Sequence, residues 1–382
     1  MHQRAWRGRD ESPVSVQVCK PKLPDADRLV PYLRRIDASR WYSNDGPLVR
    51  RFEDRLAEHA GAASAGRVAV ACNATAAVTA TLLALDVAPG SLCMMPAWTF
   101  AASGQAVVRA GLIPWFVDVA EDGMLAPAAA RRFAPDAPGR LGAVLAVSAF
   151  GRPVDARGWE TFERDTGLPV VVDAAAAFDT VRASAVPAVV SLHATKIVGV
   201  GEGAFVVCDD AARMRAVRER INFGFAGSRE AVAGAMNAKM SEYAAAVGLA
   251  ALDEWPATRD AFRRVALDYA AALPALRGAR LQPGYGTDWV TATTIVETPA
   301  DRLEAIEDAL SSAGIGSRRW WGDGLPAQRA FARYPCSELP VTGELAATTL
   351  GLPCWADLAT GTIARIAEIV HTACAGAAAS RG

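Results

Sequence analysis

Seven short apolar runs divide the chain up to residue 209. They are rich in Val, Leu, Ile and Ala and lie at 67–71, 91–95, 113–119, 141–149, 168–174, 188–194 and 204–209. Apolar runs of this length are typical of strands that are buried on both faces of a sheet. Helical patterns separate most of the first five runs, as at 75–85 and 100–111. Alternating strands and helices predict an α/β domain with a large, mostly parallel sheet.

The last two runs lie closer together than the others and flank a turn around Lys196. Strands joined by so short a connection pair antiparallel, as a hairpin. The large sheet is therefore expected to be mixed.

Before this region, residues 1–20 have the pattern of a loose leader. Helices are predicted at 21–36, after a proline-rich turn, and at 48–61, where Gly61 is a typical helix stop. After helices at 240–255 and 263–278 the pattern changes to an α+β remainder, with a strand at 289–297 and helices at 300–314 and 362–376. We therefore predict a leader (1–20), a large domain (21–255) and a small C-terminal domain (256–382), divided near Trp255-Pro256.

Composition and charge narrow the function. Hydrophobic residues make up 52% and charged residues 21% of the chain, as in an ordinary globular enzyme. A net charge of −1, with no Lys/Arg block, argues against nucleic acid or an anionic membrane as the main partner. A small-molecule ligand fits this composition better.

The cysteines and histidines form no motif. The seven cysteines are widely spaced without a C-x-x-C pair, which predicts reduced thiols and a cytoplasmic location. The N-terminal stretch has no apolar core typical of a signal peptide, and no run is long enough to span a membrane. With four scattered histidines, no metal site is expected.

Lysine is rare in this chain. The 40 basic residues comprise 36 arginines and four lysines: Lys20, Lys22, Lys196 and Lys239. A chain that uses arginine for ordinary positive charge is expected to keep lysine where an amine must lose its proton and attack a carbonyl carbon. Lys196, in the turn between two strands, is the leading candidate for this role.

The glycines after Lys196 match the residue spacing of a dinucleotide-binding fingerprint, but not the structural context that it requires. Gly199-x-Gly201-x-x-Ala204 has the spacing, but a strand pattern follows it. The fingerprint must instead open a helix. We interpret these residues as a glycine turn.

The residues around the predicted sheet supply what pyridoxal phosphate (PLP) requires: an amine, a carboxylate for the ring nitrogen, donors for the phosphate and a flat face for the ring. Asp173 ends a strand and could hold the ring nitrogen, or it could cap the following turn. Ala74 and Thr75, which follow Asn73 between a strand and a helix, could cradle the phosphate, or the stretch could be a plain N-cap.

Three more residues are weaker candidates for this site. Trp98 could stack on the ring or pack in the core, and Ser191 could bind phosphate or expose its hydroxyl. His193 could carry a proton or serve only the structure.

Taken together, these motifs resemble the DegT/DnrJ/EryC1/StrS family of PLP-dependent sugar aminotransferases. The resemblance covers nearly the whole chain from about residue 20, in the same order. It rests on NATAAV, MMPAWTFAASGQAVVRAGLIPWFVDV, AFGRPVD, LPVVVDAA, SLHATKIVGVGEGAFVV, INFGF, NAKMSEYAAAVGL, RRWWGDGLPAQRAF and LGLPCW.

The resemblance implies a type I aminotransferase fold, PLP as cofactor, and a homodimer with active sites at the subunit interface. It makes Lys196 the Schiff-base lysine and general base, and Asp173 the partner of the ring nitrogen. Ala74, Thr75 and Ser191 would hold the phosphate and Trp98 would stack. Asn237 would reach the partner subunit's cofactor phosphate.

Two positions depart from the family pattern. Ala176 stands where relatives carry Gln three residues after the aspartate, and Pro326 stands where they tend to carry His. Both positions bear on substrate and cofactor contacts.

The resemblance predicts transfer of an amino group from an amino acid, with L-glutamate as the expected donor, to a nucleotide-linked keto sugar. The RWYSNDGP and NATAAV stretches favour a dTDP-4-keto-6-deoxyhexose, for an amino sugar used in polysaccharide or glycoside biosynthesis. The alternatives are a regulator or sensor on the same fold, and a sugar dehydratase. Dehydratases replace the Schiff-base lysine by histidine, so Lys196 speaks against that class.

Overall fold

The large sheet contains all seven strands that the apolar runs predict. In this computed structural model, which describes residues 15–273 and 278–375, the strand order is β1-β7-β6-β5-β4-β2-β3. The strands are β1 (Val68–Ala71), β2 (Leu92–Pro96), β3 (Ile113–Val117), β4 (Leu141–Val147), β5 (Val170–Asp173), β6 (Ala188–Ser191) and β7 (Ala204–Val207).

Only β7 runs against the others. It pairs antiparallel with both β1 and β6, and the remaining pairs are parallel. The prediction of a mixed sheet, in which the last two strands pair antiparallel, is thus confirmed. Because β7 is reversed, β1 and β6 point the same way, and the carboxyl ends of six strands meet at one edge. The turn between β6 and β7 reverses the chain at that same edge.

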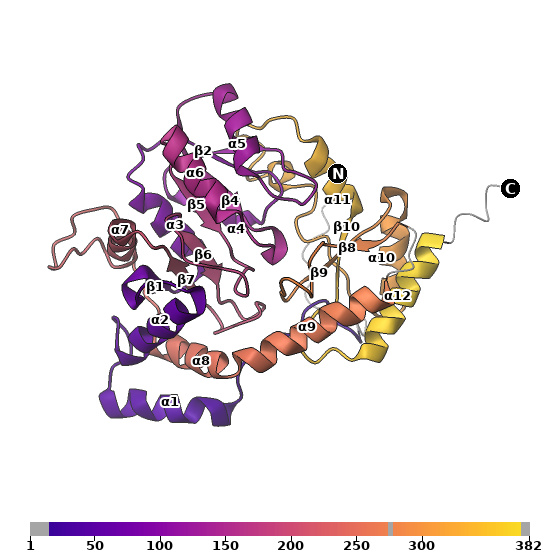
Figure 1. The fold of residues 1–382 in the computed structure, drawn as a ribbon, viewed down its shortest axis with the longest axis horizontal. Helices are drawn as coiled ribbons and strands as arrows, with labels where there is room; N and C mark the ends of the chain where they lie inside the picture. The colour runs from indigo at the N-terminus through magenta and orange to yellow at the C-terminus, as the bar shows by residue number, and fades with distance from the viewer. Residues whose placement is uncertain (1–14, 274–277, 376–382) are drawn as a thin grey trace.

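Helices cover both faces of this sheet (Figure 1). One face carries α3 (Ala74–Ala84), α4 (Ala101–Arg109) and α7 (Ala211–Ile221); the other carries α2 (Pro47–Ala60), α5 (Pro127–Phe133), α6 (Ala156–Thr166) and α8 (Glu242–Asp253). Side chains of β1 alternate between the two layers: Val68 and Val70 face one, Ala69 and Ala71 the other. This two-sided burial explains why the strands are apolar throughout.

The N-terminal helices begin and end at capping residues. Helix α1 (Ala26–Ser39) begins after Asp25, whose carboxylate accepts the N–H of Arg28 at 3.3 Å, so the helix predicted at 21–36 starts a few residues later. Helix α2 ends as predicted at Gly61, whose φ of 65° is the left-handed conformation that glycine adopts without strain.

A second, three-stranded antiparallel sheet follows α9 (Trp255–Ala272). It consists of β8 (Arg280–Leu281), β9 (Thr294–Glu297) and β10 (Thr349–Leu352), with helices α10 (Leu303–Ser312), α11 (Pro340–Thr348) and α12 (Thr360–Ala375). Short 3-10 turns occur at Ala65–Arg67, Ala134–Asp136, Ala149–Gly151, Ala300–Arg302 and Leu325–Ala327. The predicted 289–297 strand is shorter in the structure, and the last residues of the helix predicted at 263–278 fall partly outside the described residues.

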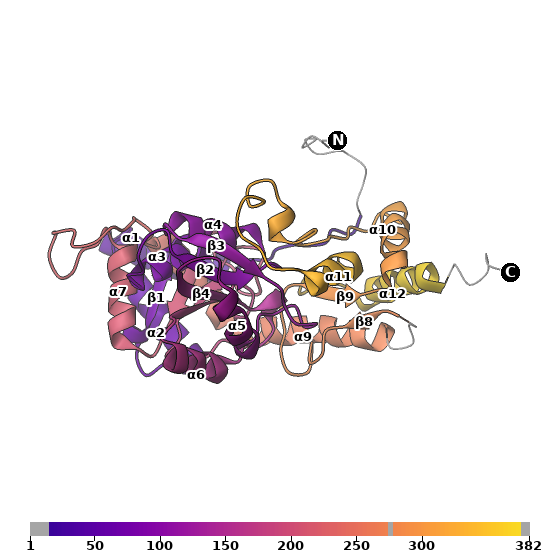
Figure 2. The same ribbon diagram turned by 90° about the horizontal axis from the view of Figure 1, so that it is seen from above.

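Helix α9 runs from the large sheet to the small one (Figures 1 and 2). We propose that the domain boundary lies where this helix begins, at Trp255, because every strand of the second sheet comes after it. The leader-and-two-domain division therefore remains our proposal.

The leader is not loose where the structure describes it. Val16 pairs with Ile315, and its carbonyl accepts the N–H of Gly316 at 2.8 Å. The N–H of Cys354 donates to the carbonyl of Val18 at 3.1 Å. The extended segment thus supplies partners for backbone groups of the small domain, and this pairing is the reason it is ordered. Residues 1–14 of the predicted leader lie outside the described residues.

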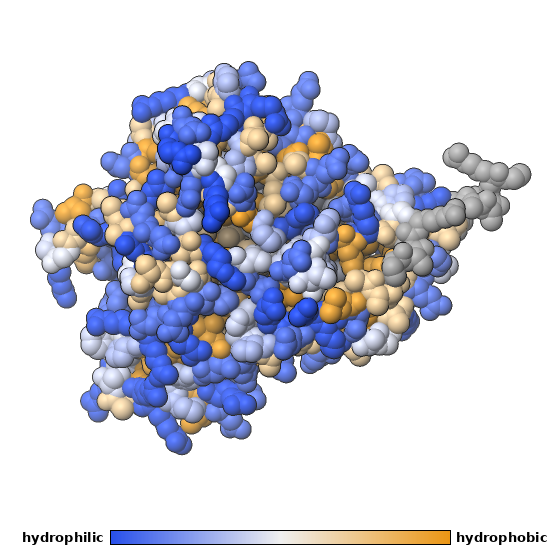
Figure 3. Space-filling model, viewed as in Figure 1, coloured by the Kyte–Doolittle hydropathy of each residue, from blue (hydrophilic) through white to orange (hydrophobic). Residues whose placement is uncertain are grey.

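Within the described ranges, no helix has the length and hydropathy needed to cross a bilayer. The face shown in Figure 3 is mostly hydrophilic, with small apolar areas between the charged residues.

Candidate active site

A cavity of about 760 Å³ lies at the edge where the carboxyl ends of the strands meet. It collects six of the predicted residues, which come from segments far apart in the chain: Ala74, Thr75, Asp173, Ser191, His193 and Lys196. Each follows or ends a strand of the large sheet, or lies in the β6–β7 turn. The strand directions described above explain why they converge.

Asp173 ends β5 and is 7% exposed. Its Oδ2 accepts a hydrogen bond from Ser103 Oγ at 2.7 Å, and its Oδ1 accepts one from the N–H of Ala175 at 3.1 Å. Burial raises the pKa of Asp173, while these two hydrogen bonds and the charge of Lys196 act in the opposite direction. The carboxylate is therefore held by two donors and keeps lone pairs free for a cationic ligand.

Lys196 lies in the β6–β7 turn, and its backbone N–H donates to the carbonyl of His193 at 2.8 Å. Burial lowers the pKa of its amine, and the charges of Asp173 and Cys19 oppose this shift. A lowered pKa increases the neutral fraction of the amine, which is the nucleophilic form.

The glycine-turn interpretation is confirmed. Strand β7 follows the turn directly, so no helix stands where a dinucleotide site requires one. Gly201 has a φ of 91°, and a Cβ on Gly199 would lie 3.0 Å from the Cα of Ala194. Both glycines are thus needed for the shape of the turn that presents Lys196.

The start of α3 forms an anion-binding corner of the cavity. Asn73 is the N-cap, and its side chain accepts the N–H of Ala76 at 2.8 Å. The amides of Ala74 and Thr75 belong to the first turn, where a helix provides no backbone acceptor. Ser191 is 5% exposed and its Oγ accepts the N–H of His193 at 3.2 Å, which leaves its own hydrogen to donate. These groups match the needs of a phosphate.

His193 is held within the same turn. Its Nδ1 accepts the N–H of Thr195 at 3.2 Å and lies 2.8 Å from Thr195 Oγ1, so Nε2 carries the proton of the neutral ring. Nε2 lies 3.6 Å from a carboxylate oxygen of Glu202. A role for His193 in proton transfer remains a prediction.

Trp98 does not face the cavity. It is 3% exposed and packs edge-on against Trp321, with ring centroids 5.4 Å apart. Phe100, two residues later, is 59% exposed and lines the cavity. The turn after β2 therefore points the first aromatic ring into the core and the second into the site. We therefore propose Phe100, in place of Trp98, as the residue that stacks on the PLP ring.

Asn237 does not line the cavity of its own chain. It is exposed, and its Oδ1 accepts a hydrogen bond from Lys239 Nζ at 2.7 Å. Its predicted contact with a partner subunit's cofactor stays a prediction.

Several groups at this site were not predicted from the sequence. Ser103 and Thr99 are buried hydroxyls beside Asp173, and only their place just after a strand end could have suggested them. Arg318 and Trp320 line the cavity from the small domain, with the guanidinium 4.8 Å from the ring centroid of Trp320. Among the described residues, Trp320 Nε1 is the one buried side-chain nitrogen or oxygen without a hydrogen-bond partner.

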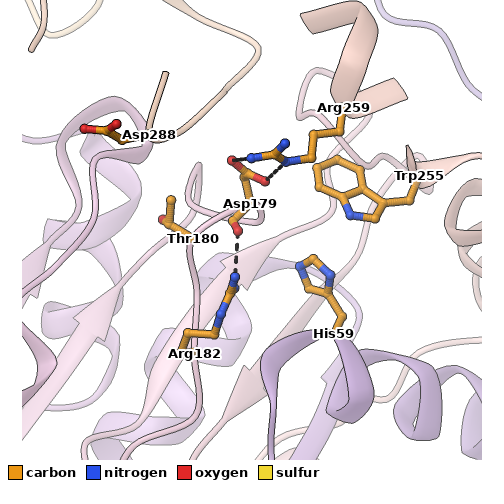
Figure 4. Close-up of a pocket in the computed structure, with 7 residues that line it drawn as sticks. All are labelled: His59, Asp179, Thr180, Arg182, Trp255, Arg259 and Asp288. Carbon is orange, nitrogen blue, oxygen red and sulfur yellow. Dashed lines mark hydrogen bonds and ion pairs between the residues drawn. The ribbon is translucent and has the colours of Figure 1, made fainter. Parts of the chain in front are cut away.

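Another cavity, of about 460 Å³, shares no lining residue with this site (Figure 4). Its lining residues are His59, Asp179, Thr180, Arg182, Trp255, Arg259 and Asp288. The carboxylate of Asp179 accepts hydrogen bonds from Arg259 Nε at 2.6 Å and from the N–H of Val290 at 3.1 Å. Arg182 donates to the carbonyl oxygens of Val181 and Asp179. These charged groups already have hydrogen-bond partners within the protein. We therefore interpret the cavity as part of the structural contact between the loop after β5 and α9, and not as a ligand site.

Three comparisons connect this geometry to known proteins. The profile of the DegT/DnrJ/EryC1/StrS aminotransferase family matches residues 25–371. The dTDP-4-amino-4,6-dideoxy-D-glucose transaminase of Escherichia coli is 25% identical over 372 residues, which cover 93% of this chain and 98% of that protein.

Two solved structures share the fold over nearly their whole length. A putative PLP-dependent aminotransferase from Bacillus cereus ATCC 10987 superposes with a TM-score of 0.87 at 26% identity, covering 93% of this chain and 99% of that one. DesI, solved in the presence of its TDP-sugar product, superposes with a TM-score of 0.84 at 33% identity, covering 94% of this chain and 93% of that one.

Proposed function

Since the chain belongs to the DegT/DnrJ/EryC1/StrS aminotransferase family, we propose that it is a PLP-dependent transaminase acting on a nucleotide-linked keto sugar. The observation that carries the proposal is the meeting of Lys196, Asp173 and the start of α3 in one cavity. The amine, the carboxylate and the anion corner are three of the four groups that PLP requires, and Phe100 offers the fourth, a flat face.

When bound, PLP would act as an electron sink for bonds at the amino-bearing carbon. Lys196 would hold the cofactor and, once released, would move the proton at that carbon, because its lowered pKa favours the neutral base. Asp173 would bind the protonated ring nitrogen. The amides of Ala74 and Thr75 and the hydroxyl of Ser191 would bind the phosphate.

The cavity also suits a sugar and a diphosphate. Phe150 and Trp321 line it with two rings stacked on each other, their centroids 4.0 Å apart, and an aromatic lining is typical of pockets for small molecules. The arginines Arg109 and Arg318 add positive charge, which favours phosphate groups. A dTDP-4-keto-6-deoxyhexose as acceptor is supported by the E. coli transaminase and by DesI, and L-glutamate is the proposed donor.

Ala176 lines the cavity without a side-chain donor. Its carbonyl accepts a hydrogen bond from Thr291 Oγ1 at 3.4 Å, so the loop is anchored through its backbone. We propose that the contact that Gln makes in relatives is absent here.

A homodimer is part of the proposal. Tyr42 and Tyr243 are exposed and stack with centroids 6.2 Å apart, and exposed Phe223 lies under the amine of Lys239 at 4.1 Å. Exposed aromatic residues of this kind are typical of a protein interface, and Phe223 directly follows Asn222, which pairs with Asn237. Sedimentation velocity of the purified protein tests this directly.

We also propose a cytoplasmic location. The seven cysteines are unpaired and four of them are partly or fully exposed to solvent at Cys19, Cys72, Cys336 and Cys374. Thiols in this state fit a reducing compartment.

The experiment is an absorbance titration with PLP, then L-glutamate, then a panel of dTDP and UDP keto sugars. The wild type should gain a visible band that glutamate bleaches and a keto sugar restores. Lys196→Ala should lose the band, whereas Lys22→Ala, which changes an exposed lysine, should keep it. Cofactor binding without bleaching by any amino acid would refute turnover and favour a sensor.

A further inference from the structure

Two buried hydroxyls form a chain that ends on Asp173. Ser103 Oγ lies 2.7 Å from Asp173 Oδ2, and Thr99 Oγ1 lies 2.9 Å from Ser103 Oγ. Thr99 is 0% exposed and Ser103 is 1% exposed, so bulk water does not compete for these bonds. The chain comes from the segment after β2, although β4 stands between β2 and β5 in the sheet.

The ionisation of Asp173 sets the direction of the chain. A serine hydroxyl has one hydrogen, and an ionised carboxylate can only accept. With Asp173 ionised, Ser103 donates to it, and Thr99 must then donate to Ser103. The 2.7 Å distance agrees with the length of a charge-assisted O–H···O bond, about 2.5–2.7 Å.

The backbone fixes both donors to the carboxylate. Ser103 lies in the first turn of α4, where its N–H donates to the carbonyl of Phe100 at 3.1 Å. The positive end of that helix also favours a negative charge nearby. The other carboxylate oxygen accepts the N–H of Ala175. Each oxygen of Asp173 therefore has one fixed protein donor, and the plane of the carboxylate is determined.

We propose that Ser103, oriented by Thr99, is a positioning residue that keeps Asp173 ionised and turned toward the protonated ring nitrogen of PLP. The proposal rests on the proposed function, since that nitrogen belongs to the cofactor. If Ser103 served only packing and hydrogen bonding within the core, its replacement would weaken the binding of every ligand of the cavity equally. A serine that acts through Asp173 affects only ligands with a ring nitrogen.

The test compares two ligands of the apoprotein, PLP and 1-deazapyridoxal phosphate, whose ring lacks the nitrogen. Both carry the aldehyde and the phosphate, so contacts with Lys196 and α3 are shared. Dissociation constants are measured by quenching of tryptophan fluorescence for the wild type, Ser103→Ala, Ser103→Thr and Thr99→Val. The matched control is Thr81→Val, because Thr81 is 0% exposed and its hydroxyl donates to the carbonyl of Ala77, at 2.8 Å, within its own helix.

Ser103→Ala should weaken PLP about 10- to 100-fold, the range expected for one hydrogen bond to a charged group. Its affinity for the deaza analogue should not change. Thr99→Val should give a smaller loss in the same direction, and Ser103→Thr should retain the wild-type selectivity. Thr81→Val should change neither constant.

The proposal is overturned if Ser103→Ala weakens the binding of both ligands equally, or if it weakens the binding of neither. If that variant does not fold, Thr99→Val decides by the same comparison, because an equal loss for both ligands there also overturns it. A wild-type protein that binds neither ligand would refute the proposed function itself, so the two failures are distinguishable.

Discussion

Replacing Glu242 by Ala should destabilise the large domain by about 3 kcal/mol, because a buried carboxylate there caps a helix that has no cap of its own. Glu242 is 1% exposed. Its Oε2 accepts the N–H of Leu48 and its Oε1 the N–H of Val49, each at 2.8 Å. The residue at the N-cap of α2, Gly46, has no side chain to do this.

The magnitude follows from these two bonds. Leu48 and Val49 are 4% and 1% exposed, so water cannot replace the lost acceptor without opening the fold. Each buried donor left unpaired costs about 1–3 kcal/mol, so two donors cost about 2–6 kcal/mol, and we take about 3 kcal/mol, in the lower half of this range, as the expected loss. For a domain of this size that loss corresponds to a fall in Tm of about 6–12 °C.

The assay is thermal unfolding followed by circular dichroism, with Glu58→Ala as the control for an exposed glutamate. Gly46→Ala tests the same cap by displacing the carboxylate instead of removing it. A Cβ at Gly46 would lie 2.7 Å from Glu242 Cδ and 2.7 Å from Trp41 Cδ1, while the φ of −73° suits alanine, so any destabilisation comes from these clashes and not from backbone strain. If Glu242→Ala unfolds at the same temperature as Glu58→Ala, the reasoning about buried caps is wrong for this site.

Two further predictions concern a pH-dependent cap and the aromatic residues after β2. Asp210 caps α7 through the amides of Ala212 and Arg213, and mainly the bond from Arg213 lowers its pKa below 3.8. Asp210→Ala should therefore cost about 1 kcal/mol at neutral pH, and urea unfolding should show this difference vanish as the pH falls through the lowered folded-state pKa. Phe100→Ala should weaken PLP binding in the fluorescence titration but leave Tm unchanged, whereas Trp98→Ala should lower stability by about 3–5 kcal/mol through core loss; the opposite pattern would restore Trp98 as the stacking residue.

The large sheet was predictable because each of its strands is buried on both faces and so forms an unbroken apolar run. Elements with weaker signals were not predicted. Strand β8 has two residues, and β10 contains Gly351, which leaves room for the indole of Trp320. These strands depend on contacts with distant segments, and local pattern does not report such contacts.

Site residues that lie at the ends of strands were predictable from the sequence. Contacts that depend on the order of the strands in the sheet were not. Asp173 and Ser191 end parallel strands, and such ends meet at one edge by topology. The bond from Ser103 to Asp173 joins residues 70 positions apart and needs the order β5-β4-β2, which no local pattern reveals. Whether Trp98 or Phe100 faces the site depends on the backbone conformation of the turn after β2, which the sequence pattern does not reveal.

The pairing of the N-terminal segment with the small domain has a consequence for synthesis on the ribosome. Ser15 Oγ donates to the carbonyl of Gly314, a contact across 299 positions. At about 5–20 residues per second, this segment waits about 15–60 s for its partner to be made. Cys19, which lines the cavity, belongs to the same segment. The cavity is thus lined by residues of both segments, such as Cys19 and Arg318, so a nascent chain can complete this cavity only after the small-domain segment has been translated.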